Sequence, residues 1–420
     1  MLVLVGLYDE LLPRLDGSAD PAFVRTGPWA FDLPLPAFVT NSGGAPIFLS
    51  LVLLSAIATA YVVGLGVIHR LPGDRRTLLI VLGFSVLASV IMLVSPPSRN
   101  ADLDYYAFEG RMIIRDGQNP YAVPARALAD DAWFPVLSPT WRALTTGYGP
   151  AWLAIASGVD VVTDHGGGLS DLARTLTGFR LLFVVLGSFN ALFIWSILGI
   201  IAPERRLTGT IAYVWNPVVL LIGVEHNDTA MLFLALLGIW LEVHGRPALA
   251  IVALTLSALL KYLTGPLLIA YLVWRWRSAG RRRTLVLAIL AAVTTGLVFL
   301  PFDPIVFLSH LPTYLHQSGR LDHIEQASFL LVAMVVIGSL IALSWPRQLN
   351  QVFSVATLVL FAYLAELSRD WFPWYVVSVL GISTLPGGWW LGAAATSGVT
   401  WILGLHQGTA YLAGLAQSSL

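Results

Sequence analysis

The sequence predicts an all-α, polytopic integral membrane protein, with one membrane-embedded domain over residues 1–420 and about twelve membrane segments. Two observations support this fold class. Of all residues, 57% are hydrophobic and 11% are charged, and the mean hydropathy is +0.76, which is far more apolar than a soluble globule. The apolar residues also form runs long enough to cross a bilayer, where backbone groups must bond within a helix.

The charges and the cysteine content narrow the possible chemistry. The formal net charge is zero, which offers no electrostatic attraction for nucleic acid. The chain has no cysteine, which excludes disulfides, thiolate catalysis and Cys-ligated metals. Any chemistry must therefore use carboxylates, histidine, arginine, lysine or the backbone. Among 24 basic residues there is a single lysine, Lys261, and it lies inside an apolar run.

The elements follow from the N-terminus. Residues 1–46 are expected to form an N-terminal interfacial segment, because Asp9 and Glu10 interrupt the first apolar run and the rest is rich in Pro, Gly and aromatic residues. Apolar runs then predict membrane spans at 47–69, 78–97, 177–202, 207–223, 229–244, 284–301, 328–345, 351–366, 374–386 and 389–404.

Arginines predict the orientation in the cell membrane, because short cytoplasmic loops are enriched in basic residues. Several arginines follow or precede these spans, and all are expected on the cytoplasmic side: Arg70, Arg75, Arg76, Arg205, Arg206, Arg246 and Arg347. Alternation then places five segments outside the cytoplasm: the long first loop from residue 98 to 147, residues 223–228, the neighbourhood of Lys261, a second loop at 302–327, and residues 367–374.

Two helices are predicted to break inside the membrane. Half-helices at 248–260 and 266–276, joined at Lys261–Gly265, keep the basic stretch 274–283 in the cytoplasm. A half-helix at 148–162 that returns to the same side extends the first extracytoplasmic loop to 98–163. Broken helices at membrane depth persist only where they are buried in protein or line a cavity.

The first loop begins with two carboxylates, Asp102 and Asp104. On a helix, this spacing directs the two side chains to different sides. One aspartate could remove a proton from a substrate hydroxyl, while the other orients it or helps to hold a divalent cation such as Mg²⁺ or Mn²⁺, with Asp104 as the possible ligand. The alternative is a solvated loop in which the acids cap a helix that starts near Asn100.

Lys261 gives this loop a possible partner. A lone ammonium in an apolar segment is costly and often marks a substrate site, so Lys261 is a candidate receptor for phosphate or diphosphate. The alternative is a lysine that reaches the interface by snorkelling. Arg180, inside the span 177–202, has the same two interpretations.

Two further groups of polar residues are predicted outside the cytoplasm. Residues 225–228 include His226, Asn227 and Asp228, which could bind sugar hydroxyls, a metal or a phosphate, or could simply cap a helix. The 302–327 loop carries side chains that could contact a headgroup: His310, His316, Arg320 and His323. The spacing of these histidines fits no compact metal site.

The stretch DLDYYAFEGRMIIRDGQNPY, which starts at Asp102, resembles the first external loop of GT-C glycosyltransferases that use polyprenyl-phosphate sugars. Its D-x-D-Y and PY elements are similar to those of glycosylphosphatidylinositol mannosyltransferase I. Other segments are similar to lipomannan α-1,6-mannosyltransferases in the same order along residues 78–385. These landmarks are Trp215-Asn216-Pro217, His226-Asn227-Asp228, KYLTGPLL from Lys261, and Phe372-Pro373-Trp374-Tyr375, whereas Tyr148-Gly149-Pro150 is similar to a Y-x-P-L element of the glycosylphosphatidylinositol enzyme.

The resemblance implies a GT-C-like helical bundle and an inverting transfer of a hexose, with mannose as first choice, from a polyprenyl phosphate to a hydroxyl of a glycolipid or glycan outside the cytoplasm. It implies Asp102 as general base, with Asp104 as second choice, and Lys261, with Arg180 or His226, at the leaving phosphate. The expected substrate contacts extend to Asn227, Asp228, Tyr105, Tyr106, Tyr148 and Arg320.

Two other functions remain open from the sequence. A secondary transporter also uses broken helices and buried charges, although its polar groups would lie near the midplane and its halves would repeat. Another polyprenol-linked polymerase or ligase would share the lipid and the compartment. Dependence on a divalent cation is also left open by the resemblance.

Overall fold

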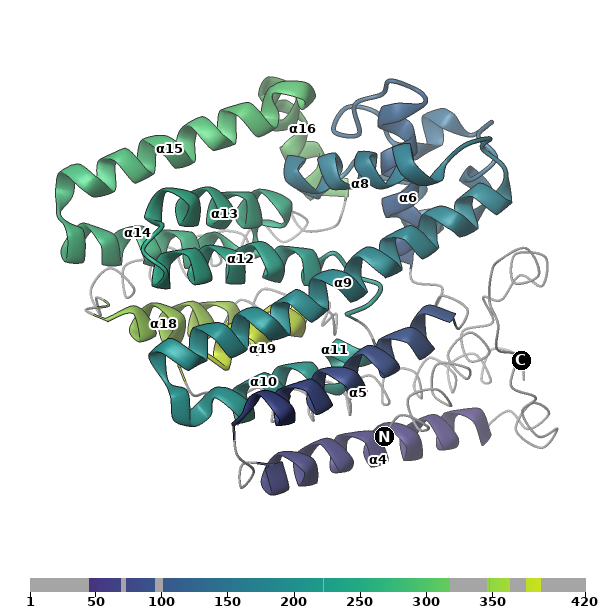
Figure 1. The fold of residues 1–420 in the computed structure, drawn as a ribbon. Coiled ribbons are helices and arrows are strands. Elements are labelled where there is room, and N and C mark those ends of the chain that lie inside the picture. The colour runs from purple at the N-terminus through teal and green to yellow at the C-terminus, as the bar shows by residue number, and fades with distance from the viewer. Residues whose placement is uncertain are drawn as a thin grey trace. The chain divides into compact units, whose positions relative to one another are not determined.

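The computed structural model describes residues 45–68, 73–94, 101–221, 223–317, 346, 348–362 and 375–386. Every regular element in these ranges is a helix, which confirms the all-α prediction for the described part of the chain (Figure 1). The chain divides into two units. One comprises residues 1–99, 180–226 and 372–420, and the other comprises residues 100–179 and 227–371. The interfacial segment through residue 44 and the spans at 328–345 and 389–404 lie outside the described residues.

The first unit is built around two short helices. It contains α4 (Ala45–Ile68), α5 (Arg75–Val94), the part of α9 (Leu169–Ile201) from Arg180 onward, α10 (Arg206–Val214), α11 (Pro217–Leu221) and α19 (Tyr375–Ser383). The helices α4, α5 and α19 each pack against both α10 and α11. The Tyr61 hydroxyl of α4 donates to the carbonyl oxygen of Ala212 at 2.5 Å, and the Asn216 amide donates to that hydroxyl at 3.3 Å.

The predicted span 207–223 differs from the structure, because it is two helices with a break at Trp215 and Asn216. Pro217 has no N–H to donate, so a continuous helical ladder would lose a bond there. The Asn216 side chain instead accepts from the backbone N–H of Val218 at 3.0 Å and starts the second helix. A hydropathy window averages over this break, which is why the sequence predicted one span.

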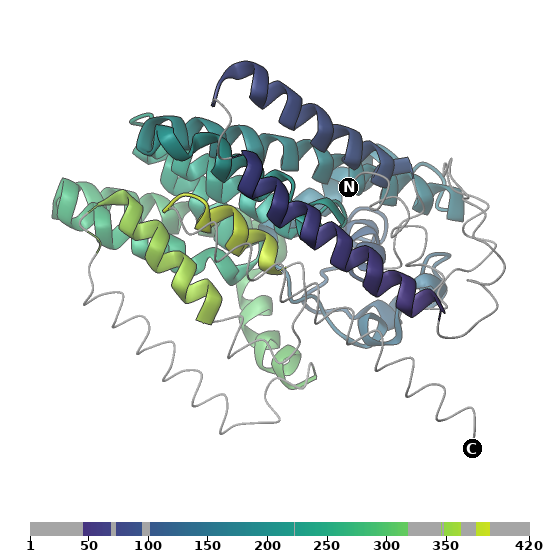
Figure 2. The ribbon, with the colours of Figure 1, turned by 90° about the horizontal axis from the view of Figure 1, so that it is seen from below.

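The second unit carries the long loop and a group of packed helices. Before α9 it contains α6 (Ala101–Ile114), η1 (Ala125–Leu128), η2 (Phe134–Val136), α7 (Pro139–Ala143) and α8 (Pro150–Thr163). After α9 it contains α12 (Asp228–Val243), α13 (Pro247–Leu260), η4 (Tyr262–Thr264), α14 (Gly265–Ala279), α15 (Arg281–Phe299), η5 (Leu300–Phe302), α16 (Pro304–Gln317) and α18 (Leu349–Ala362). The α13 helix packs against α12, α8 and α15, and α14 packs against α15 and α18 (Figures 1 and 2).

The contact between α12 and α13 is close because small residues line it. A Cβ on Gly238 would lie 2.7 Å from the Leu254 Cγ atom, so any larger residue would force α12 or the Leu254 side chain to shift. The Ser257 hydroxyl also donates to the carbonyl oxygen of Met231 at 2.8 Å. The predicted interruption after this helix is observed, since α13 ends at Leu260, Lys261 has extended backbone (φ −150°, ψ 116°) and α14 begins at Gly265.

Three described helical stretches are long and apolar enough to cross a membrane: Arg75–Val94, Leu169–Ile201 and Arg281–Phe302. Shorter apolar helices are Ser55–Val67, Pro150–Thr163, Pro247–Leu260 and Leu349–Leu360. Large apolar side chains on α15, such as Ile289 and Leu297, are exposed, as expected for a surface that contacts lipid. The total of about twelve segments stays a prediction.

Candidate active site

The two aspartates of the long loop lie in the first turn of α6. Carboxylates are favoured there because the helix dipole places partial positive charge at the N-terminus. The Asp102 side chain is buried, whereas Asp104 is half-buried, which fits the expectation that this spacing directs them to different sides. Asn100 lies outside the described residues, so its role as a cap stays a prediction.

The Asp102 carboxyl lies among aromatic and charged groups of the second unit. Burial raises its pKa to about 6, which the charge of Asp228 also favours. The ammonium of Lys261 and hydrogen bonds from the Tyr148 and Trp141 side chains lower the pKa, but they do not outweigh burial. Near pH 7 the group is mostly ionised yet able to take up a proton, which is the property needed of a general base.

Lys261 is paired with α12 across the break between α13 and α14. Its Nζ lies 2.6 Å from the Asp228 Oδ2 atom and 3.4 Å from the Asn227 Oδ1 atom. The Asp228 side chain is 0% exposed, whereas 14% of the lysine side chain is exposed. The lysine is therefore not an isolated buried charge, because Asp228 compensates it and holds it in place. The ammonium nevertheless keeps some accessible surface.

Three aromatic side chains pack together on the same side of α6. The Tyr106 ring lies edge-on to Tyr148 and Trp152, with centroid distances of 5.3 and 4.6 Å. The Tyr148 ring centroid is also 6.0 Å from the Lys261 Nζ atom. Tyr105, directed elsewhere, stacks on Trp141 at 4.4 Å. Tyr106 and Tyr148 therefore lie near Asp102, and Tyr148 also approaches Lys261.

Glu109 was missed by the sequence reasoning. It lies seven residues after Asp102, two turns along the same face of α6, and its side chain is 0% exposed. The Trp152 Nε1 donates to its Oε2 atom at 3.2 Å. Burial raises its pKa to about 8, so the carboxyl is mainly neutral at pH 7. Its helical spacing from Asp102 was the available signal.

Gly149 brings α8 against the end of α13. Its backbone N–H donates to the carbonyl oxygen of Leu260 at 3.0 Å. A Cβ at this position would overlap the carbonyl oxygen of Leu259, at a separation that side-chain carbons do not reach. Only glycine permits this approach, which holds Tyr148 next to the residue that follows α13, Lys261.

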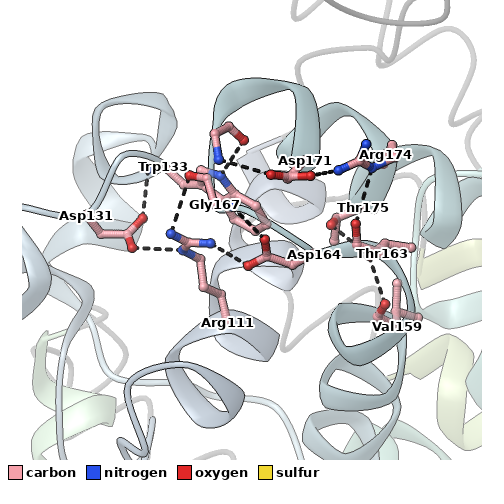
Figure 3. Close-up of polar contacts among 11 residues, drawn as sticks. Arg111, Asp131, Trp133, Val159, Thr163, Asp164, Gly167, Asp171, Arg174 and Thr175 are labelled. Carbon is pink, nitrogen blue, oxygen red and sulfur yellow. Dashed lines mark hydrogen bonds and ion pairs between the residues drawn. The ribbon is translucent and has the colours of Figure 1, made fainter.

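Arg111, in the last turn of α6, binds side chains of the segment between α6 and α9 (Figure 3). The Arg111 Nε atom lies 2.8 Å from the Asp131 Oδ2 atom, and its guanidinium also forms an ion pair with Asp164. The same guanidinium lies 4.3 Å from the centroid of the Trp133 ring, whose Nε1 donates to the carbonyl oxygen of Gly168 at 3.0 Å. These contacts order the loop between α6 and α9.

Three other predicted site residues belong to the first unit or lie outside the described residues. Arg180 and His226 belong to the first unit, where Arg180 Nε lies 3.2 Å from the Glu225 Oε1 atom and its guanidinium donates to the carbonyl oxygen of Met92. His226 is buried, and Arg320 lies outside the described residues. In the described ranges, no three His, Asp or Glu side chains gather as metal ligands.

Comparisons with known proteins identify relatives of this chain. A family model described as "Alpha-(1->6)-mannopyranosyltransferase, N-terminal domain" matches residues 6–278. Alpha-(1->6)-mannopyranosyltransferase A of Mycobacterium tuberculosis is 30% identical over 253 residues, which are 57% of this chain and 45% of that protein. The protein of the same name from Corynebacterium glutamicum is 28% identical over 196 residues, or 45% of this chain and 38% of that protein.

The matched region spans less than half the length of either relative. The comparison with solved structures gave no match.

Proposed function

Because the chain belongs to the alpha-(1->6)-mannopyranosyltransferase family, we propose that it is a membrane-bound mannosyltransferase. Its donor is a polyprenyl-phosphate mannose, and its acceptor is a hydroxyl group of a glycolipid or glycan. The reaction takes place on the extracytoplasmic side of the cell membrane, which is the side that the distribution of arginines predicts for the long loop. The observation that carries the assignment of the site is the buried Asp102 carboxyl beside the Lys261–Asp228 pair.

Asp102 is the general base of the proposed transfer. Its carboxylate takes the proton from the acceptor hydroxyl as the oxygen forms a bond to C1 of the mannosyl group. The bond between C1 and the phosphate oxygen breaks, and the polyprenyl phosphate leaves with the electron pair. Attack from the opposite face inverts the configuration at C1, so a β-linked donor gives an α-mannoside. General-base assistance of this kind contributes on the order of 10²–10⁴-fold in rate.

Lys261 stabilises the leaving phosphate. Negative charge increases on the phosphate oxygen as the bond to C1 breaks, and a cation already oriented by Asp228 interacts with that charge without reorganisation. The ammonium is partly exposed while its carboxylate partner is fully covered, so an anion approaches the positive side of the pair. Asn227 contributes to the orientation of the lysine. No step of the proposed transfer is assigned to a divalent cation.

The test is transfer of radiolabelled mannose from polyprenyl-phosphate mannose to a mannosylated lipid by the purified protein in proteoliposomes. Asp102→Asn removes the base and nearly keeps the side-chain shape, so we expect a loss of about 10²-fold or more in kcat with an unchanged melting temperature. Asp104→Asn is the matched control and keeps most of the activity. Transfer that survives Asp102→Asn, or no transfer by the unaltered protein, would contradict the proposal. Glucose and arabinose donors in the same assay test the choice of sugar.

A further inference from the structure

Trp141 is an aromatic residue of the loop to which the mechanism above gives no role. It lies on the short helix α7. The backbone N–H of Trp141 donates to the Ser138 hydroxyl at 3.4 Å, and this bond caps the start of the helix. The next residue, Arg142, donates to the carbonyl oxygen of Pro135 at 2.7 Å and lies over the Phe134 ring at 4.9 Å. These contacts of Trp141 and Arg142 fix the backbone of α7 around the tryptophan.

The Trp141 ring has one covered face and a polar edge next to the base. It stacks on Tyr105 with a centroid distance of 4.4 Å and an interplanar angle of 10°. Tyr105 is 1% exposed, whereas Trp141 is half-buried, so the accessible surface of the stack belongs to the tryptophan. The side chain also hydrogen-bonds the Asp102 carboxyl, and its one donor is Nε1–H.

A flat apolar surface beside a carboxylate suits a sugar ring. The face of an aromatic ring carries partial negative charge and attracts C–H groups, which a pyranose presents on its apolar face. A pyranose stacked on the second face of Trp141 would place ring hydroxyls at the indole edge, where Asp102 lies. Tyr148, at 6.1 Å from Trp141 and tilted by 32°, borders the same region and also donates to Asp102.

We propose that Trp141 is the platform for the terminal mannopyranose ring of the acceptor, with Tyr105 as its backing. This inference rests on the proposed function and adds the acceptor subsite to it. The platform holds the acceptor hydroxyl within reach of Asp102, which turns proton removal into a reaction between positioned groups. The Nε1–H bond separately stabilises the ionised form of the base.

Two substitutions of Trp141 distinguish the effect of its aromatic face from the effect of its N–H group. Trp141→Leu removes the platform, so we expect the KM for the acceptor to rise about tenfold, which matches a ring contact of about 1.4 kcal/mol, while the KM for the donor stays within about twofold. Trp141→Phe keeps an aromatic face and loses the donor. Its acceptor KM changes little, but the ascending limb of its pH–rate profile moves to higher pH, since the lost hydrogen bond lowered the Asp102 pKa.

Binding of octyl α-mannoside, followed by saturation-transfer NMR in sugar-free nanodiscs, tests the platform without any transfer. We expect signals with the unaltered protein and with Trp141→Phe, and none with Trp141→Leu. Trp276→Leu is the matched control, because that exposed tryptophan lies on α14, and it keeps the signal. Binding that survives Trp141→Leu, or no binding to the unaltered protein, would overturn the platform. Intact binding without mannosyl transfer would refute the proposed function and leave the subsite standing.

Discussion

The pH dependence of mannosyl transfer should report the ionisation of Asp102. With a pKa of about 6, the carboxylate fraction is about 9% at pH 5 and about 91% at pH 7, so kcat/KM should increase about tenfold between these values. The measurement is kcat/KM for a soluble acceptor analogue with the protein in nanodiscs, at intervals between pH 4.5 and 8. A flat profile across this range would exclude Asp102 as the base.

The Asp228→Asn substitution should move the ascending limb of the pH–rate profile in a defined direction. The charge of Asp228 raises the pKa of Asp102, and the charge of Lys261 lowers it. Removal of the Asp228 charge eliminates the first effect and leaves the Lys261 ammonium uncompensated, so the ascending limb should move to lower pH. A shift of one unit corresponds to about 1.4 kcal/mol. The asparagine keeps a carbonyl oxygen for Lys261, which limits the damage to folding.

Lys261→Met should move the limb in the opposite direction. A neighbouring opposite charge lowers the pKa of a carboxyl by about 1–3 units, so its loss should move the limb upward by about one unit or more. Asp104→Asn is the control and should leave the limb in place. If Asp228→Asn and Lys261→Met move the limb in the same direction, the electrostatic account is wrong. If Asp104→Asn abolishes the limb, Asp104 is the base.

Three further substitutions test the scaffold of the site by thermal unfolding. Gly149→Ala should destabilise the protein by several kcal/mol, because the new Cβ would overlap a backbone carbonyl oxygen of α13, whereas Gly158→Ala, inside α8, has open space and should not destabilise it. Stability should fall as pH rises from about 4.5 to about 8, because over this range the folded state holds the Glu109 proton that the unfolded chain has lost; Glu109→Gln should weaken that dependence. Arg111→Met should cost about 3–5 kcal/mol by leaving carboxylates uncompensated, and Arg126→Met, at an exposed position, should cost under about 0.5 kcal/mol.

The sequence was sufficient to predict the break between α13 and α14. The break at Lys261 was predicted from the rule that arginines stay in the cytoplasm, and the helices on both sides end and begin close to the predicted residues. The Lys261–Asp228 pair was not predictable, because 33 residues separate the partners and only the packing of α12 on α13 brings them together. Glu109 was missed for a similar reason, since its importance depends on Trp152 and Asp102.

The pairing of Lys261 changes the electrostatics expected of the site. An unpaired lysine would attract phosphate whatever the state of the base, but Lys261 and Asp228 together are neutral. Ionised Asp102 then gives the cluster a charge of about −1, which opposes an incoming phosphate, and protonated Asp102 removes that opposition. In the proposed transfer, the proton of the acceptor hydroxyl moves to Asp102 and neutralises it. The negative charge on the leaving phosphate is therefore less unfavourable. Proton removal and phosphate departure become coupled through one buried carboxyl, so Asp102→Asn, which is neutral at all pH values, should bind a phosphate product at least as tightly as the unaltered protein while failing to transfer mannose.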